Sequence, residues 1–280
     1  MTTQRSRPSV RTWLLAALEL AAVVLVARLM VQATQTPASV PAGDHDHGMT
    51  GMPSMSNAAV PAAQWSWVEY TAIGVSAVAL AWWLIRRQSV AAVLAAASLV
   101  ALATSPAVRV LATQSHLIAM VALELLLVIA PLLMLAAERP RPEGSSGGPS
   151  RPATVVTVTA ALLYAGLLIV VHLPAIHSRS AELGSVPVWV PPIALVIGVT
   201  YWSGVLRTAG RVSRRIRRAA LLGAQEVAAL IGLLSLFGAW GAMAHPSPLG
   251  ISMAWDQRIG GIIMLATCAA VGIPIARRIS

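Results

Sequence analysis

The sequence has few charged residues, a single cysteine and no lysine. Charged residues make up only 11% of the 280 residues, whereas hydrophobic residues make up 57%. Soluble globular chains carry roughly 25% charged residues, so this composition excludes a single soluble domain. The one cysteine, Cys268, lies inside a long apolar run. An intrachain disulfide and a thiolate metal cluster are therefore both excluded.

Long apolar runs recur along the whole chain. Each is close to 20 residues, which is enough for a helix to cross a bilayer core of roughly 30 Å. Helices are expected because lipid offers no hydrogen-bond partners, so backbone groups must pair within the segment. The sequence therefore predicts an all-α, polytopic transmembrane helical bundle of about eight spans. The predicted spans are residues 12–34, 66–85, 88–106, 114–137, 153–173, 187–206, 219–243 and 257–276.

The distribution of arginine predicts the orientation of these spans. A net charge of +10 is compatible with nucleic-acid binding, but the basic residues lie mostly in short loops between apolar runs. That pattern is typical of a membrane orientation signal. Sixteen arginines fall on one predicted side and four on the other. Both termini are therefore expected in the cytoplasm of a multi-pass cell-membrane protein, with lipid and not nucleic acid as its partner.

Three regions follow from this reading. Residues 1–34 form an N-terminal transmembrane anchor, residues 35–64 a long outer loop, and residues 65–280 a seven-span membrane domain. The arginines before the first run resemble the start of a signal peptide. The run is long, however, and no convincing small-residue cleavage site precedes Thr36. An uncleaved anchor is expected.

The outer loop is rich in potential metal ligands. Imidazole and thioether groups are borderline or soft ligands, and thioether favours Cu(I), while a His-Asp-His sequence can hold Cu(II). The alternative is a polar linker whose methionines occur by chance. Three methionines at a spacing of three beside two histidines favour copper binding over that alternative. The candidate ligands in the loop are His45, His47, Met49, Met52 and Met55.

The other four histidines fall on the same predicted face as the loop. His116 opens the fourth span, His172 and His177 close the fifth, and His245 closes the seventh. A single histidine at a membrane border is common where a helix ends among lipid headgroups. Four that converge on one rim of a bundle indicate a site.

The fourth span carries a column of three functional side chains. His116, Met120 and Glu124 stand at positions i, i+4 and i+8, which places them on one helix face. Glu124 then lies roughly 12 Å below His116, at a rise of 1.5 Å per residue. A carboxyl at that depth is costly unless it is protonated, paired or hydrated. It could stabilise a metal cation or anchor a neighbouring helix.

The last span opens with Asp256, followed by Gly260 and Gly261. Small residues allow close contact between membrane helices, so the glycines predict a tight helix pair. Asp256 has two interpretations. It is either an N-cap that accepts bonds from free backbone N–H groups, or a metal ligand at the outer face.

Several segments resemble the CtaG-type cytochrome c oxidase assembly factors. The segment DQRIGGIIM is similar to that family's DQ-x-x-(A/G)-G-x-x-M signature. SHLIAMVALELLLVIAPLLML in the fourth span, HLPAIH in the fifth and VTYWSGVL in the sixth give weaker matches. The resemblance covers roughly residues 66–280. It implies copper delivery to the oxidase copper centre on the outer side, with oxidase subunits as partners.

Residue by residue, the resemblance carries over best to His116, His172 and Asp256. Met120 stands where the family has a second histidine in the fourth span. A histidine expected before the sixth span is absent, and Glu182 is the nearest polar residue. These departures leave two interpretations, a divergent member whose site combines histidine with methionine, or a member that has lost the family's metal site.

The sequence as a whole predicts a membrane copper-binding and delivery protein, not an enzyme. It shows no nucleophile–base pair and no phosphate-binding glycine loop. The alternatives are a membrane b-type cytochrome with histidine ligands, a copper transporter, and a structural oxidase subunit. The predicted metal ligands are His45, His47, Met49, Met52, Met55, His116, Met120, His172, His177, His245 and Asp256.

Overall fold

The computed structural model describes residues 65–138, 150–173, 176, 182–237 and 248–279. Within these ranges the protein is helical and contains no strand. The elements are α2 (Trp67–Arg86), α3 (Ser89–Thr104), α4 (Pro106–Gln114), α5 (His116–Glu124), the π-helix η1 (Leu125–Ile129), α6 (Ala130–Ala137), α7 (Arg151–Val171), α9 (Val190–Arg207), α10 (Arg214–Leu236), α11 (Met253–Thr267), the π-helix η2 (Cys268–Gly272) and α12 (Ile273–Ile279).

Six helices in this described part are long and apolar enough to cross a membrane. A seventh candidate span exists if α3 and α4 are counted together. The described helices overlap seven of the predicted spans, which is consistent with a multi-pass membrane protein. The first predicted span, residues 12–34, and the loop 35–64 lie outside the described residues. The total of eight spans and the cytoplasmic termini stay predictions.

The segment between the predicted spans 88–106 and 114–137 is the short helix α4. It meets α3 at an angle of 57°. Ser105 begins it by accepting a hydrogen bond from the backbone N–H of Val108, and Pro106 occupies the first helical position. Both are standard features of a helix start. Arg109 then donates from Nε to the carbonyl of Val186 at 2.7 Å, which attaches α4 to the segment before α9.

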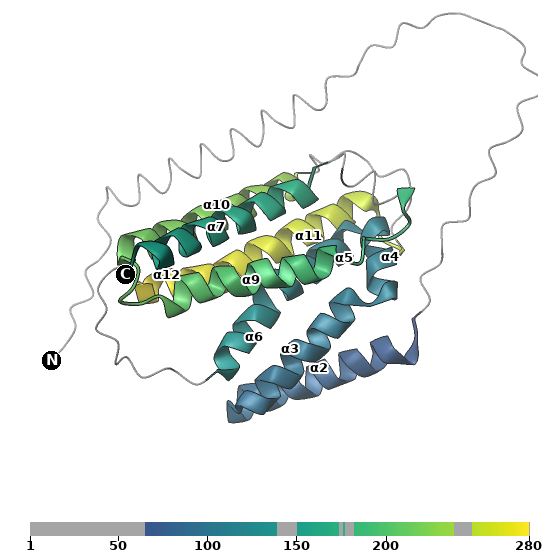
Figure 1. The fold of residues 1–280 in the computed structure, drawn as a ribbon. Coiled ribbons are helices and arrows are strands. Elements are labelled where there is room, and N and C mark those ends of the chain that lie inside the picture. The colour runs from purple at the N-terminus through teal and green to yellow at the C-terminus, as the bar shows by residue number, and fades with distance from the viewer. Residues whose placement is uncertain (1–64, 139–149, 174–175, 177–181, 238–247, 280) are drawn as a thin grey trace, which may run out of the picture.

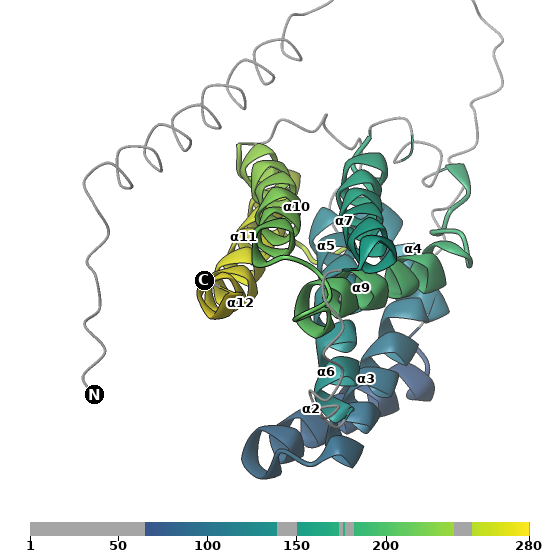
Figure 2. The same cartoon turned by 60° about the vertical axis from the view of Figure 1, so that its left-hand side comes forward.

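The helices pack in a sequence that runs across the molecule. α2 packs on α3, α3 on α6, α6 on α9, α9 on α7, α7 on α10, and α10 on α11. Figure 1 shows these helices from the side, and Figure 2 shows α10, α11 and α12 at one flank and α2 and α3 at the other. The span His116–Ala137 lies between the two flanks. Its first half, α5, contacts α11, while its second half contacts α3 and α9.

A proline in the second half of that span is compensated by a tryptophan. Pro131 has no N–H, so it cannot donate the bond that a regular α-helix directs at the carbonyl of Leu127. Trp202 of α9 donates from Nε1 to this carbonyl at 2.9 Å, and its side chain is fully buried. α9 can approach this closely because it carries Gly198, where a Cβ would lie 2.7 Å from the Leu127 oxygen.

Glycines also bring α10 and α11 into backbone contact. A Cβ at Gly261 would lie 2.5 Å from the carbonyl oxygen of Gly232 and 2.9 Å from the backbone nitrogen of Leu236. The predicted tight helix contact at Gly260 and Gly261 is therefore confirmed. Gly261 faces α10, while Gly260 faces α5.

At the end of the bundle where α6 and α9 finish and α10 begins, arginines donate hydrogen bonds to the last carbonyls of the helices. Arg207 donates from Nη2 to the carbonyl of Leu135 at 2.8 Å and forms an ion pair with Glu138. Arg217 donates from Nε to the carbonyl of Val205 at 2.8 Å. Each helix leaves its last carbonyls without internal partners, so these bonds close the ends of α6 and α9.

We expect Trp202→Phe to destabilise the protein by about 1–2 kcal/mol, because it keeps an aromatic ring but leaves the Leu127 carbonyl without its donor in an apolar core. Thermal unfolding of the purified protein in detergent measures this effect. Trp82→Phe is the matched control, because Trp82 is 39% exposed. Equal unfolding temperatures for the two variants would contradict the compensating role of Trp202.

Candidate functional site

Four helices bring functional side chains together at the end of the bundle opposite the arginine-rich end. α5 supplies His116 and Met120, the end of α7 supplies His172, α10 supplies Ser235, and α11 supplies Asp256; α5, α7, α10 and α11 lie near one another in Figure 1. Each of these side chains is at most 6% exposed. Met120 and Asp256 each contact one of the two histidines, and the two imidazole rings contact each other. We call these four residues together with Ser235 the His/Met cluster.

Asp256 connects α11 to the first turn of α5. Its Oδ2 accepts from the backbone N–H of His116 at 2.6 Å and of Leu117 at 3.3 Å. Its Oδ1 accepts from the hydroxyl of Ser115 at 2.7 Å, and the same hydroxyl oxygen caps the N–H of Ile118. The expected N-cap role is therefore present, but it serves the neighbouring helix. The N-cap of α11 itself is Ser252.

His172 has different partners at its two ring nitrogens. Nδ1 lies 2.6 Å from the carbonyl oxygen of Leu168, and because a carbonyl only accepts, this bond assigns the hydrogen to Nδ1. In a neutral imidazole the other nitrogen, Nε2, then presents a lone pair. Nε2 lies 3.2 Å from Sδ of Met120, and a thioether sulfur also offers lone pairs and no hydrogen. In the neutral tautomer that carries its hydrogen on Nδ1, His172 therefore turns a lone pair toward the Met120 sulfur in a buried position.

His116 places a second imidazole beside this pair. The ring centroids of His116 and His172 are 5.9 Å apart, in an edge-to-face arrangement with 72° between the planes. Nε2 of His116 lies 3.2 Å from the hydroxyl of Ser235. The absence of a side chain at Gly260 makes room, since a Cβ there would lie 2.9 Å from Cδ2 of His116 and 3.2 Å from Cγ of Met120.

The donor set is two imidazoles and one thioether. Among the described residues, no group of three or more histidine, cysteine, aspartate or glutamate side chains gathers closely enough to hold a metal ion. Structural zinc sites use four such ligands, so this arrangement does not fit one. Imidazole with thioether is instead a set that suits a soft monovalent cation such as Cu(I).

Seven of the predicted ligands lie outside the described residues, namely His45, His47, Met49, Met52, Met55, His177 and His245. The structure adds two groups that the sequence reading missed, the hydroxyl of Ser235 and the carbonyl of Leu168. A lone serine within the apolar run of α10 is the only sequence signal for the first. The second is a backbone group, which no residue pattern marks.

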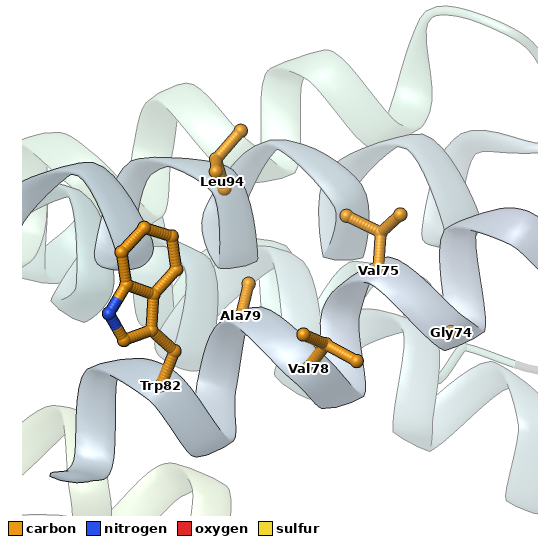
Figure 3. A pocket seen from close by; sticks show the side chains of 6 residues that line it. All are labelled: Gly74, Val75, Val78, Ala79, Trp82 and Leu94. Atoms are coloured by element: carbon orange, nitrogen blue, oxygen red, sulfur yellow. The ribbon is translucent and has the colours of Figure 1, made fainter.

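The described surface also carries a groove between α2 and α3 that is lined by apolar side chains (Figure 3). It contains no ionisable group, so it offers nothing to hold a metal or move a proton. The lining residues are Gly74, Val75, Val78, Ala79, Trp82 and Leu94. The His/Met cluster is therefore the better candidate for a functional site.

Taken together, the apolar helices and the buried cluster at one end of them are consistent with a multi-pass helical membrane protein. No family model matches the chain, and neither a curated protein nor a solved structure matches it. The similarity of DQRIGGIIM to the oxidase assembly factors therefore stays a resemblance carried by those residues.

We expect Asp256→Ala to lower the stability of the metal-free protein by about 2–3 kcal/mol, because the backbone N–H groups of α5 lose a charged acceptor. Asp256→Asn keeps one acceptor oxygen and is expected to cost about half as much. The measurement is thermal unfolding in detergent with a metal chelator present. Glu182→Ala, at an exposed position, is the control. If Asp256→Ala unfolds at the wild-type temperature without metal, the attachment is not structural.

Proposed function

We propose that the protein is a copper-binding protein of the cell membrane that holds Cu(I) at its outer face and delivers it to cytochrome c oxidase during assembly. Copper is the cargo, and no catalysis is involved. The observation that carries the proposal is the pairing of His172 Nε2 with Met120 Sδ at 3.2 Å. Two buried groups that both donate electron pairs are explained by a soft cation that binds them.

The surroundings of His172 support a ligand role. Histidines that bind metal usually donate their other ring N–H to a carbonyl or carboxylate, which fixes the ring and raises the basicity of the binding nitrogen. The bond from Nδ1 of His172 to the Leu168 carbonyl has this form. His116 supplies the second imidazole. Asp256 is assigned a positioning role, because both of its oxygens already accept hydrogen bonds from α5.

We assign the initial capture of copper to the outer loop. His45, His47, Met49, Met52 and Met55 would take up copper before it reaches the buried cluster. His177 and His245 stand in the segments that follow α7 and α10. We therefore propose that they lie at the outer face, like the His/Met cluster, and could bind copper between the loop and that cluster. The oxidase is proposed as the recipient from the sequence resemblance alone, and oxidase subunits are the implied partners.

A copper transporter is a second candidate, favoured by two observations. Two spans contain π-helices, η1 and η2, and transporter spans are often interrupted near their binding sites. Glu124 is buried directly before η1. Copper flux into sealed vesicles that contain the purified protein would favour transport over delivery. The third alternative, a b-type cytochrome, fits less well. Its two histidines would have to turn Nε2 toward a haem, yet these atoms face Met120 and Ser235.

The first prediction from this proposal concerns Cu(I) affinity. In a full-length chain whose five loop ligands are changed to serine, Met120→Leu should weaken Cu(I) binding at least about tenfold, which is about 1.4 kcal/mol. Leucine nearly preserves the packed volume, so the fold is expected to persist. Competition with a Cu(I) chelator measures the affinity. Met134→Leu, at a position 38% exposed, is the control. Equal affinities in all three proteins would exclude Met120 as a ligand.

The second prediction concerns the oxidase in cells. A strain that lacks this protein should still make oxidase polypeptides, but under copper limitation they should contain less copper and show low activity. Excess copper should partly restore activity by mass action. His116→Ala with His172→Ala should reproduce the deletion, whereas loss of the loop should have a milder effect. Wild-type copper content of the oxidase in the deletion strain would exclude delivery as the function.

A further inference from the structure

Two columns of side chains descend from the His/Met cluster along the contact between α5 and α11. On α5 the column is His116, Met120 and Glu124, which share one helix face by their spacing and are all buried. On α11 the same spacing of four gives Gly260 and Met264, and then Cys268 at the start of η2. The contact of Gly260 with His116 and Met120 fixes the register between the helices. Met264 therefore lies one turn below the cluster and Cys268 two turns below.

Glu124 ends the α5 column with a carboxyl group whose Oε2 makes no hydrogen bond. It is 9% exposed, and its Oε2 is the only buried side-chain oxygen or nitrogen in the described part of the chain that makes no hydrogen bond. An unpaired carboxyl in a membrane interior is expensive, and such groups usually mark ion or proton sites. The π-helix η1 begins at the next residue. π-Helices of this kind occur frequently at functional sites.

Cys268 brings a sulfur atom to the same depth. It lies within electrostatic range of Glu124, as does Tyr164 of α7. Its Sγ is 3.9 Å from the carbonyl of Gln225 on α10. Met264 is 1% exposed and belongs to the same buried apolar cluster as Met120, and Cys268 packs against that cluster. One carboxyl and two sulfur atoms therefore lie below the His172–Met120 pair.

We propose that Glu124, Met264 and Cys268 form a second, deeper site for a soft monovalent cation. Metal binding to cysteine displaces a proton, so the Glu124 carboxyl and the Cys268 thiol together release one proton to solvent when the cation binds. The one negative charge left on this pair then balances one positive charge, and the occupied site is neutral in a medium where a net charge is costly. Sulfur ligands select Cu(I) or Ag(I) over harder cations. The biological ligand, Cu(I), rests on the proposed function, whereas the site itself does not. For a cation that leaves the His/Met cluster toward the membrane interior, this site would be the next binding site, one to two helical turns deeper.

The experiment uses the single thiol of the chain as its reporter. The full-length protein, with its five loop ligands changed to serine, is reacted with a maleimide in detergent at increasing Ag(I). Bound Ag(I) should slow the labelling of Cys268. Glu124→Gln and Met264→Leu should each raise the Ag(I) concentration for half-protection about tenfold or more, as expected when a group at a metal site is lost. Met134→Leu should leave it unchanged.

His172→Ala separates this proposal from the proposed function. Protection of Cys268 should persist in that variant, because the deeper site uses its own ligands, while binding at the His/Met cluster is lost. Native mass spectrometry counts the bound ions independently of thiol reactivity. Two Ag(I) are expected in the loop-substituted chain, and one in either Cys268→Ser or His172→Ala. Half-protection that is the same with Glu124→Gln and Met264→Leu as without them, or an unchanged ion count in Cys268→Ser, would overturn the deeper site.

Discussion

The carboxylate of Asp256 holds α5 and α11 in register at the end of the bundle where the histidines meet. A helix leaves its first N–H groups without internal partners, and lipid supplies none. The first turn of α5 therefore depends on the bonds that Asp256 accepts from His116, Leu117 and Ser115. A carboxylate at a helix N-terminus is also favoured by the helix dipole. The position of His116 and Met120 against α11 follows from this attachment, so the His/Met cluster depends on it.

The same requirement explains the middle of the bundle. Pro131 removes a backbone donor from the span that carries the cluster. The Trp202 indole of the neighbouring helix donates to the carbonyl left without a partner, and Gly198 allows the two helices to approach closely enough for this bond. The π-helix η1 lies on the N-terminal side of this proline. Glu124, which precedes η1, is thereby held at the boundary between the half of the span that packs on α11 and the half that packs on α9.

Much of this arrangement follows from residue spacing, and some of it does not. The face shared by His116, Met120 and Glu124 and the tight contact at Gly261 were predictable, because helical periodicity and side-chain size determine them. The helix α4 was not predicted, although Ser105 and Pro106 form a helix-start signal, because the segment between two predicted spans received no assignment. The partners of Asp256 were not predictable, because an N-cap pattern does not say which helix is capped. Residues 12–34 and the loop ligands lie outside the described residues, so the first span and copper binding by the loop stay predictions.

The central claim is that His172 and Met120 bind a soft cation directly. X-ray absorption at the copper edge tests it in a full-length chain whose loop ligands, Met264 and Cys268 are replaced. If His172 and Met120 bind Cu(I) directly, the bound ion has nitrogen neighbours from imidazole and one sulfur neighbour, and Met120→Leu removes the sulfur signal and keeps the nitrogen signal. A first shell without sulfur before that substitution, or one unchanged by it, would contradict the account.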